Sequence, residues 1–181
     1  MGDSLAYDLF VQGIGFASLA LALISVQMKK RSHLMIFQML ASLLFSLQLL
    51  LLGAITGACV DFISFIRTLI FSQRENKKWA QSPLWLYGFL LAMVVAGALT
   101  WDNIYSLLAI LGSCLSTVAL WMKDTGKIRR ISLLVGPCWI VYNLIHGSFA
   151  GVLNEILAMT SIVIGMLRLD RNKDKKQETE A

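Results

Sequence analysis

Apolar residues fill long stretches of this chain, and short polar segments separate the stretches from one another. Each stretch is about 20 residues long, which is the length an α-helix needs to cross roughly 30 Å of hydrocarbon. The connections are short, so consecutive helices should be antiparallel neighbours. The pattern predicts an all-α membrane protein with seven transmembrane helices, at residues 9–28, 33–52, 56–72, 83–100, 103–122, 127–146 and 148–169.

Lysine and arginine residues occupy alternate connections between these predicted helices. They follow the first, third, fifth and seventh helix, whereas the N-terminus and the other connections contain none. Loops rich in Lys and Arg stay in the cytoplasm, so the N-terminus should lie outside and the C-terminus inside. The basic residues concerned are Lys29, Lys30, Arg31, Arg74, Lys77, Lys78, Lys123, Lys127, Arg129, Arg130, Arg168, Arg171, Lys173, Lys175 and Lys176.

The composition agrees with a membrane protein and excludes several other classes. Of the 181 residues, 57% are hydrophobic and only 15% are charged, and the mean hydropathy is +0.68. The net charge of +5 does not indicate nucleic-acid binding, because the basic residues lie at helix ends rather than on one face. Cys59, Cys114 and Cys138 have no metal-ligand or disulfide spacing. Since no nucleophile–base pair or phosphate loop is present, we expect neither an enzyme nor a cofactor or metal.

Two segments of the chain, 42–61 and 136–155, share one plan at an offset of 94 residues. Each segment ends one apolar helix, turns at a glycine, and opens another helix that carries a carboxylate near its start. The repeat predicts two parallel three-helix units joined by one extra helix, because a second unit of the same orientation needs one additional crossing. The matched pairs are Gly53 with Gly147, Gly57 with Gly151, and Asp61 with Glu155.

This plan divides the chain into five parts. An outside segment precedes the first repeat, a cytoplasmic loop and a linker helix separate the repeats, and the charged tail should be disordered. The parts are 1–8, 9–72, 73–100, 101–169 and 170–181, in that order.

Asp61 and Glu155 are the leading candidates for a functional site. A carboxylate within a spanning helix costs about 2.5–3.5 kcal/mol at the bilayer centre and usually faces a cavity or partner. Helical spacing places Ser64 on the face of Asp61, and Asn154 at the margin of the face of Glu155. Two such faces about a common axis would suit proton coupling or hydrogen bonding to a polyhydroxyl solute. The alternative is that both acids reach the outer headgroups or cap loop amides.

Other polar and aromatic residues within the spans extend the candidate site. Arg67 either snorkels to the cytoplasmic surface or forms an interior ion pair. Trp139, close to Asn143, either stacks against a sugar ring or fills the core, and Pro137 can kink the sixth helix. A polar side of the fifth helix either lines a wet passage or hydrogen-bonds a neighbour; it comprises Asn103, Ser106, Ser113 and Thr117.

The sequence resembles the bacterial inner membrane proteins of the YgjV family. The residues that carry the resemblance are the run 66–70 (IRTLI) and Cys138, Trp139, Asn143, Gly147, Ser148, Gly151 and Glu155. That family is similar in plan to the MtN3-like group, which includes the SWEET sugar facilitators and PQ-loop proteins. The resemblance implies a three-one-three helix plan with a central pocket. It also implies that Phe45 and Trp139 occupy aromatic positions of the pocket, and that Asp61 and Glu155 lie near its asparagine positions.

Two functional hypotheses follow. The first is a small-solute transporter of the inner membrane, sugar-like or proton-coupled, in which two three-helix bundles rock about a central pocket. The second is a non-transporting membrane protein with a structural, partner-binding or lipid-sensing role. The lipid bilayer is the expected partner in both, and a homo-oligomer is compatible with the sequence but does not follow from it.

Overall fold

The computed structural model describes residues 2–27, 31–122 and 124–180, and within them the chain forms seven α-helices, two short 3-10 helices and no strand. All seven predicted helices are present, and most of their ends agree with the prediction to within two or three residues. Their bounds are α1 Gly2–Gln27, α2 Arg31–Leu51, α3 Ile55–Ser72, η1 Gln73–Glu75, η2 Lys78–Gln81, α4 Leu84–Leu99, α5 Ser106–Trp121, α6 Thr125–Ile145 and α7 Phe149–Glu180.

The two terminal helices are longer than the apolar pattern predicted. Helix α1 begins at Gly2 and includes most of the segment 1–8, and α7 continues from Leu169 to Glu180 through the segment that was expected to be disordered. Lys, Arg, Gln and Glu are good helix formers, so the end of an apolar run marks the end of a span without ending the helix. Lys29, Lys30 and Lys123 lie outside the described residues.

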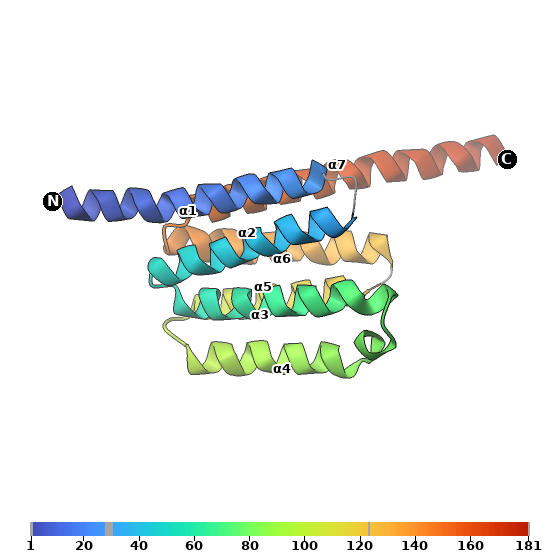
Figure 1. Ribbon diagram of the computed structural model, residues 1–181. Helices are drawn as coiled ribbons and strands as arrows, with labels where there is room; N and C mark the ends of the chain where they lie inside the picture. The colour runs from blue at the N-terminus through green and yellow to red at the C-terminus, as the bar shows by residue number, and fades with distance from the viewer. Residues whose placement is uncertain (1, 28–30, 123, 181) are drawn as a thin grey trace.

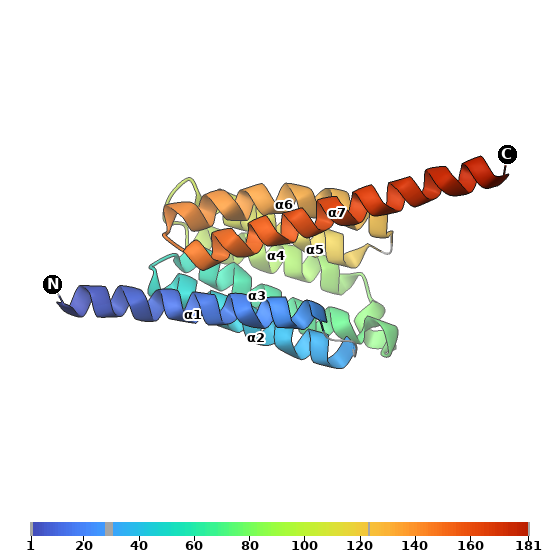
Figure 2. The ribbon, with the colours of Figure 1, turned by 90° about the horizontal axis from the view of Figure 1, so that it is seen from above.

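Helices α1, α2 and α3 pack together on one side of the molecule, and helices α5, α6 and α7 pack together on the other (Figure 2). In the N-terminal bundle, α2 packs against α1 and α3; in the C-terminal bundle, α6 packs against α5 and α7. The bundles meet where α3 contacts α5 and where α1 contacts α7. Helix α4 packs against both α3 and α5, so it covers one of these two junctions from outside (Figure 1).

Apart from the outer ends of α1 and α7, the described helices begin and end at one of two opposite ends of the molecule (Figure 1). We call the end with the α2–α3, α4–α5 and α6–α7 connections the turn end. The opposite end, which holds η1, η2 and the start of α6, is the basic end, because Arg74, Lys77, Lys78 and Lys127 are there. The topology thus gathers the basic connections of the sequence at one end. The N-terminus lies at the turn end and α7 extends past the basic end (Figure 1).

Four of the described helices are long and apolar enough to cross a membrane. They span Leu5–Ser25, Ile55–Ser72, Gly126–Ile145 and Phe149–Leu167. The apolar parts of the other three helices are shorter and span Ile36–Leu51, Leu84–Leu99 and Ser106–Trp121.

The two glycine turns at the turn end have the same backbone geometry. Gly53 and Gly147 have φ values of 78° and 71°, a left-handed conformation that glycine adopts without steric cost. After Gly53, the amide of Ala54 donates to Leu49 O at 2.9 Å, and after Gly147, the amide of Ser148 donates to Asn143 O at 2.9 Å. The repeated segments therefore form the same helix–turn–helix unit in both bundles.

Candidate functional site

A cavity of about 760 Å³ lies between the two bundles. Every α-helix except α4 contributes to its described lining. The lining reaches Ser25 of α1, Leu120 of α5 and Ile128 of α6, so the cavity extends to the basic end. Its volume falls within the range of about 300–1,000 Å³ that is usual for small-molecule sites.

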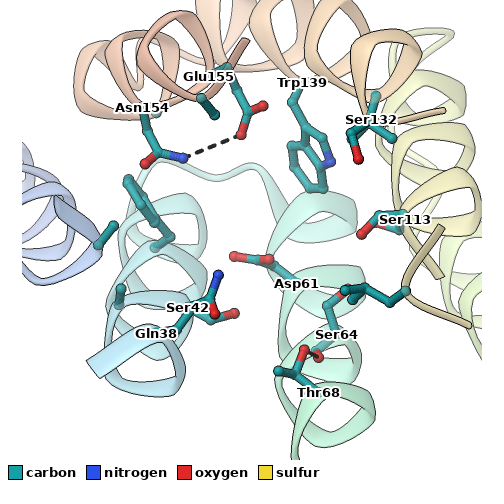
Figure 3. A pocket seen from close by; sticks show the side chains of 18 of the residues that line it. Gln38, Ser42, Asp61, Ser64, Thr68, Ser113, Ser132, Trp139, Asn154 and Glu155 are labelled. Atoms are coloured by element: carbon teal, nitrogen blue, oxygen red, sulfur yellow. Dashed lines mark hydrogen bonds between the residues drawn. The ribbon is translucent and has the colours of Figure 1, made fainter. Parts of the chain in front are cut away.

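The residues that the sequence singled out as solute-binding candidates all line this cavity. They come from α2 and α3 of one bundle and from α6 and α7 of the other, and Figure 3 shows several of their side chains around one space. The residues are Phe45, Asp61, Ser64, Trp139, Asn143, Asn154 and Glu155. The structure brings them together; their role in binding stays a prediction.

Asp61 and Glu155 extend from α3 and α7 into the same space (Figure 3). Both residues are half-buried. Among the described residues, the only hydrogen bond to either carboxylate is the one that Asn154 Nδ2 donates to Glu155 Oε1 at 3.4 Å. Neither acid caps a loop amide in this part of the chain, and the other alternative, that both acids reach the outer headgroups, stays a prediction. Both carboxylates retain acceptor capacity toward the cavity.

Within the described part of the chain, the side chain of Arg67 neither snorkels to the basic end nor forms an interior ion pair, the two alternatives that the sequence suggested. Its side chain is only 4% exposed, and its Nη1 donates to Thr117 Oγ1 at 2.6 Å and to Ser113 O at 3.4 Å. The guanidinium therefore crosses from α3 to α5 instead of snorkelling to the basic end. It forms no ion pair with Asp61 or Glu155 among the described side chains. The polar side of α5 thus serves in part to hold this neighbour.

Trp139 and Asn143 are buried on α6 and also line the cavity. The Trp139 ring packs edge-on against Tyr142, with centroids 5.8 Å apart, and belongs to the main hydrophobic cluster. One part of the ring therefore fills the core while another faces the cavity. The Asn143 amide lies against Gly151, where a Cβ atom would come within 2.7 Å of it.

The remaining candidates are placed differently from one another. The Ser64 hydroxyl donates to Val60 O at 2.8 Å, so its hydrogen-bond donor is already used within α3. Phe45 is half-buried in the lining. Pro137 is exposed on α6 and is not among the lining residues, and α6 is helical on both sides of it. The position of Pro137 therefore gives no direct contact with the cavity.

A network of hydrogen bonds at the turn end was missed by the sequence reasoning. Gln12 Nε2 donates to Gly147 O at 2.7 Å, and Ser148 Oγ donates to Gln48 Oε1 at 3.0 Å. Gln48 is fully buried, and a glutamine within an apolar run was the signal that could have revealed it. These bonds join α1 and α2 to the start of α7, and so join the two bundles.

A second contact between the bundles occupies the related position. The Gly57 amide, in the first turn of α3, donates to Tyr142 Oη of α6 at 2.8 Å. Tyr142 is 1% exposed, and it stands 94 residues after Gln48. In each bundle, the second helix therefore contributes a polar side chain that bonds the beginning of the third helix in the other bundle.

The match to a family model establishes which proteins this chain belongs with. Residues 9–173 match the Imp-YgjV model, described as bacterial inner membrane protein. The chain is thus a membrane protein of a bacterial inner membrane family, in agreement with its apolar helices. It belongs to the Imp-YgjV family. No curated protein and no solved structure matches the chain.

Proposed function

We propose that this protein is a small-solute transporter of the inner membrane. The observation that carries the proposal is the cavity between the two bundles, which is lined by carboxylates from both of them, Asp61 and Glu155. A membrane helix that served only as a scaffold would not keep acids with unused acceptor capacity toward an open space, because their desolvation is costly.

All seven helices cross the membrane in the proposed protein, in the three-one-three plan that resembles SWEET-type facilitators. Helices α3 and α6 are long enough to span, and α3 ends at the basic end where α6 begins. The chain between them must therefore return to the turn end through α4 and come back through α5. The positive-inside rule then places the basic end in the cytoplasm and the N-terminus outside.

Transport would occur by rocking of the two bundles about the cavity, a motion that the division of the helices into two separate bundles favours. Trp139 and Asn143 would add an apolar face and an amide to the binding site. No bound cofactor and no nucleotide is part of the proposal, and a protein that moves solutes in this way is not an enzyme.

Solute flux into proteoliposomes tests the proposal. Purified wild-type protein is compared with Asp61→Asn and Glu155→Gln, using labelled alanine and glucose as probes. Asp102→Asn is the matched control, because Asp102 is exposed in the α4–α5 connection outside the cavity. We expect flux in the wild type and in the control, and a loss of about tenfold or more in the two cavity variants, since one hydrogen bond to a charged group contributes about 1.5–3 kcal/mol.

Equal flux in all four proteins would remove the two acids from the mechanism. No flux of either probe above that of protein-free liposomes would favour the other hypothesis, a non-transporting membrane protein with a structural, partner-binding or lipid-sensing role.

A further inference from the structure

The cavity contains a positive group as well as two negative ones. Arg67 lines it from α3, and the hydrogen bonds of its guanidinium involve only Nη1. The Nε atom is buried without a hydrogen-bond partner among the described residues. The Nη2 atom makes no hydrogen bond to any described residue. The guanidinium therefore has donors left over after its contacts with α5.

Ser113 supplies a second unused polar atom at the same place. Its backbone carbonyl accepts from Arg67 Nη1, while its Oγ is buried without a partner in the described part of the chain. The side chain is 1% exposed and belongs to the cavity lining, and Figure 3 shows it opposite the carboxylates. Nearly all buried hydroxyls in proteins have a hydrogen-bond partner, so this exception beside a guanidinium needs an explanation.

A role of Arg67 in balancing the charge of Asp61 would not by itself explain the unused donors of the guanidinium or the unpartnered hydroxyl of Ser113. An arginine retained only for that purpose would be expected to hydrogen-bond the carboxylate, because a buried charge without such a partner is costly. Instead, the guanidinium donates to Thr117 and Ser113 of α5. It hydrogen-bonds neither Asp61 nor Glu155 among the described side chains, so the cavity presents positive and negative groups that are not bonded to each other.

We propose that the cavity binds a small zwitterion, with its carboxylate at Arg67 and Ser113 and its ammonium group at Asp61 and Glu155. This inference rests on the proposed function and names the class of solute. A guanidinium and a hydroxyl are suited to bind a carboxylate through charge-assisted hydrogen bonds. Trp139 also lines the cavity, and an ammonium group is attracted to the face of a tryptophan ring.

Equilibrium binding to the purified protein in nanodiscs tests the inference. The probes are three labelled zwitterions of increasing size, namely alanine, glycine betaine and leucine. For whichever probe is bound, competition by unlabelled compounds then shows whether binding needs the positive group, the negative group or both. Alaninamide carries only the positive group of alanine, propionate carries only the negative group, and glucose carries neither. We expect at least one zwitterion to bind about tenfold or more tightly than all three competitors.

The variant Ser113→Ala is the most informative, because the hydroxyl that it removes has no partner within the described residues. Its stability should match that of the wild type. Its affinity for the zwitterion should fall about tenfold, while its affinity for alaninamide stays within about twofold. Arg67→Gln should have the same selective effect. Asp61→Asn should lower the affinity for the zwitterion and the affinity for alaninamide together. Ser72→Ala, on α3 outside the cavity lining, is the control and should change neither affinity.

Two results would overturn the inference: none of the three zwitterions binds, or Ser113→Ala binds the zwitterion as the wild type does. Flux of glucose without binding of any zwitterion would overturn this inference and leave the proposed function standing. Binding of a zwitterion without flux would support the site and overturn the transporter instead.

Discussion

The substitution Gly57→Ala should destabilise the protein, because a methyl group at this position has no room. A Cβ atom on Gly57 would overlap Cε1 of Tyr142 and come within 2.8 Å of its hydroxyl oxygen. The Tyr142 ring is fully buried among Leu49, Ala109 and Trp139, so it cannot move aside. Overpacking costs about 1–3 kcal/mol, and loss of the bond from the Gly57 amide to Tyr142 costs about 0.5–1.5 kcal/mol. The higher helix propensity of Ala offsets up to about 1 kcal/mol, which leaves a net destabilisation of about 0.5–4.5 kcal/mol.

Reversible unfolding of the detergent-solubilised protein by increasing fractions of a denaturing detergent measures this change. Gly13→Ala is the matched control, since nothing lies within 4 Å of a Cβ atom at Gly13, and it should be as stable as the wild type or slightly more stable. In a double-mutant cycle, Tyr142→Leu should abolish most of the destabilisation that Gly57→Ala causes in the wild-type background. Equal stability of Gly57→Ala and the wild type would refute the close approach of α3 to α6 at the turn end.

Three further predictions concern other parts of the molecule. Thr117→Val should destabilise the protein by about 1–2 kcal/mol, because it leaves Arg67 Nη1 without its shorter hydrogen bond, whereas Thr117→Ser should behave as the wild type in the same unfolding assay. Gln48→Leu should weaken the junction of the bundles and expose Ser148 to exchange, measured by faster deuterium uptake at the start of α7; unchanged uptake would contradict the role of this bond. A fluorescent protein fused to the C-terminus should fluoresce in intact cells, and alkaline phosphatase fused there should be inactive; the reverse pattern would contradict the proposed orientation.

Much of the fold could be predicted because the bilayer imposes strong constraints on sequence. Each span needs a long apolar run, and both turns of the repeat need a left-handed residue, which is why Gly53 and Gly147 stand out. The collection of Asp61 and Glu155 in one cavity was also predictable. Equivalent positions in two copies of a unit lie at equivalent depths, and acids within spans avoid lipid.

The sequence could not predict how the remaining polar groups are paired. Arg67 lies within reach of the basic end, of the carboxylates and of α5, and only the packing of α3 against α5 decides that it bonds Thr117. The partners of Gln48 were equally unpredictable, because Gln12 on α1 and Ser148 just before α7 are 36 and 100 residues away in sequence. The ends of α1 and α7 were also beyond prediction, since polar residues outside a span are compatible with either helix or coil.

The distribution of hydrogen bonds along the cavity indicates which end of the molecule must change during the proposed transport cycle. Away from the α3–α5 junction, three contacts join the bundles at the turn end: Gln12 to Gly147, Ser148 to Gln48 and Gly57 to Tyr142. The α3–α5 side has bonds at both ends, from Thr56 to Ser106 at the turn end and from Arg74 to Trp121 at the basic end. Towards the basic end, α1 and α7 diverge (Figure 2), and the cavity extends to that end.

In the proposed transport cycle, the structure would correspond to a state in which these three contacts hold the bundles together at the turn end. For a solute to pass, these three contacts must break, at about 0.6–1.7 kcal/mol each for polar contacts between membrane helices, or roughly 2–5 kcal/mol together. A bound ligand can populate a conformation that lies a few kcal/mol above the most stable one, so it could populate a conformation that is open at the turn end. The bond between Arg67 and Thr117 lies on the α3–α5 junction, away from this end, so it can persist while the turn end opens. That junction, covered by α4, is the natural axis about which the two bundles would rotate.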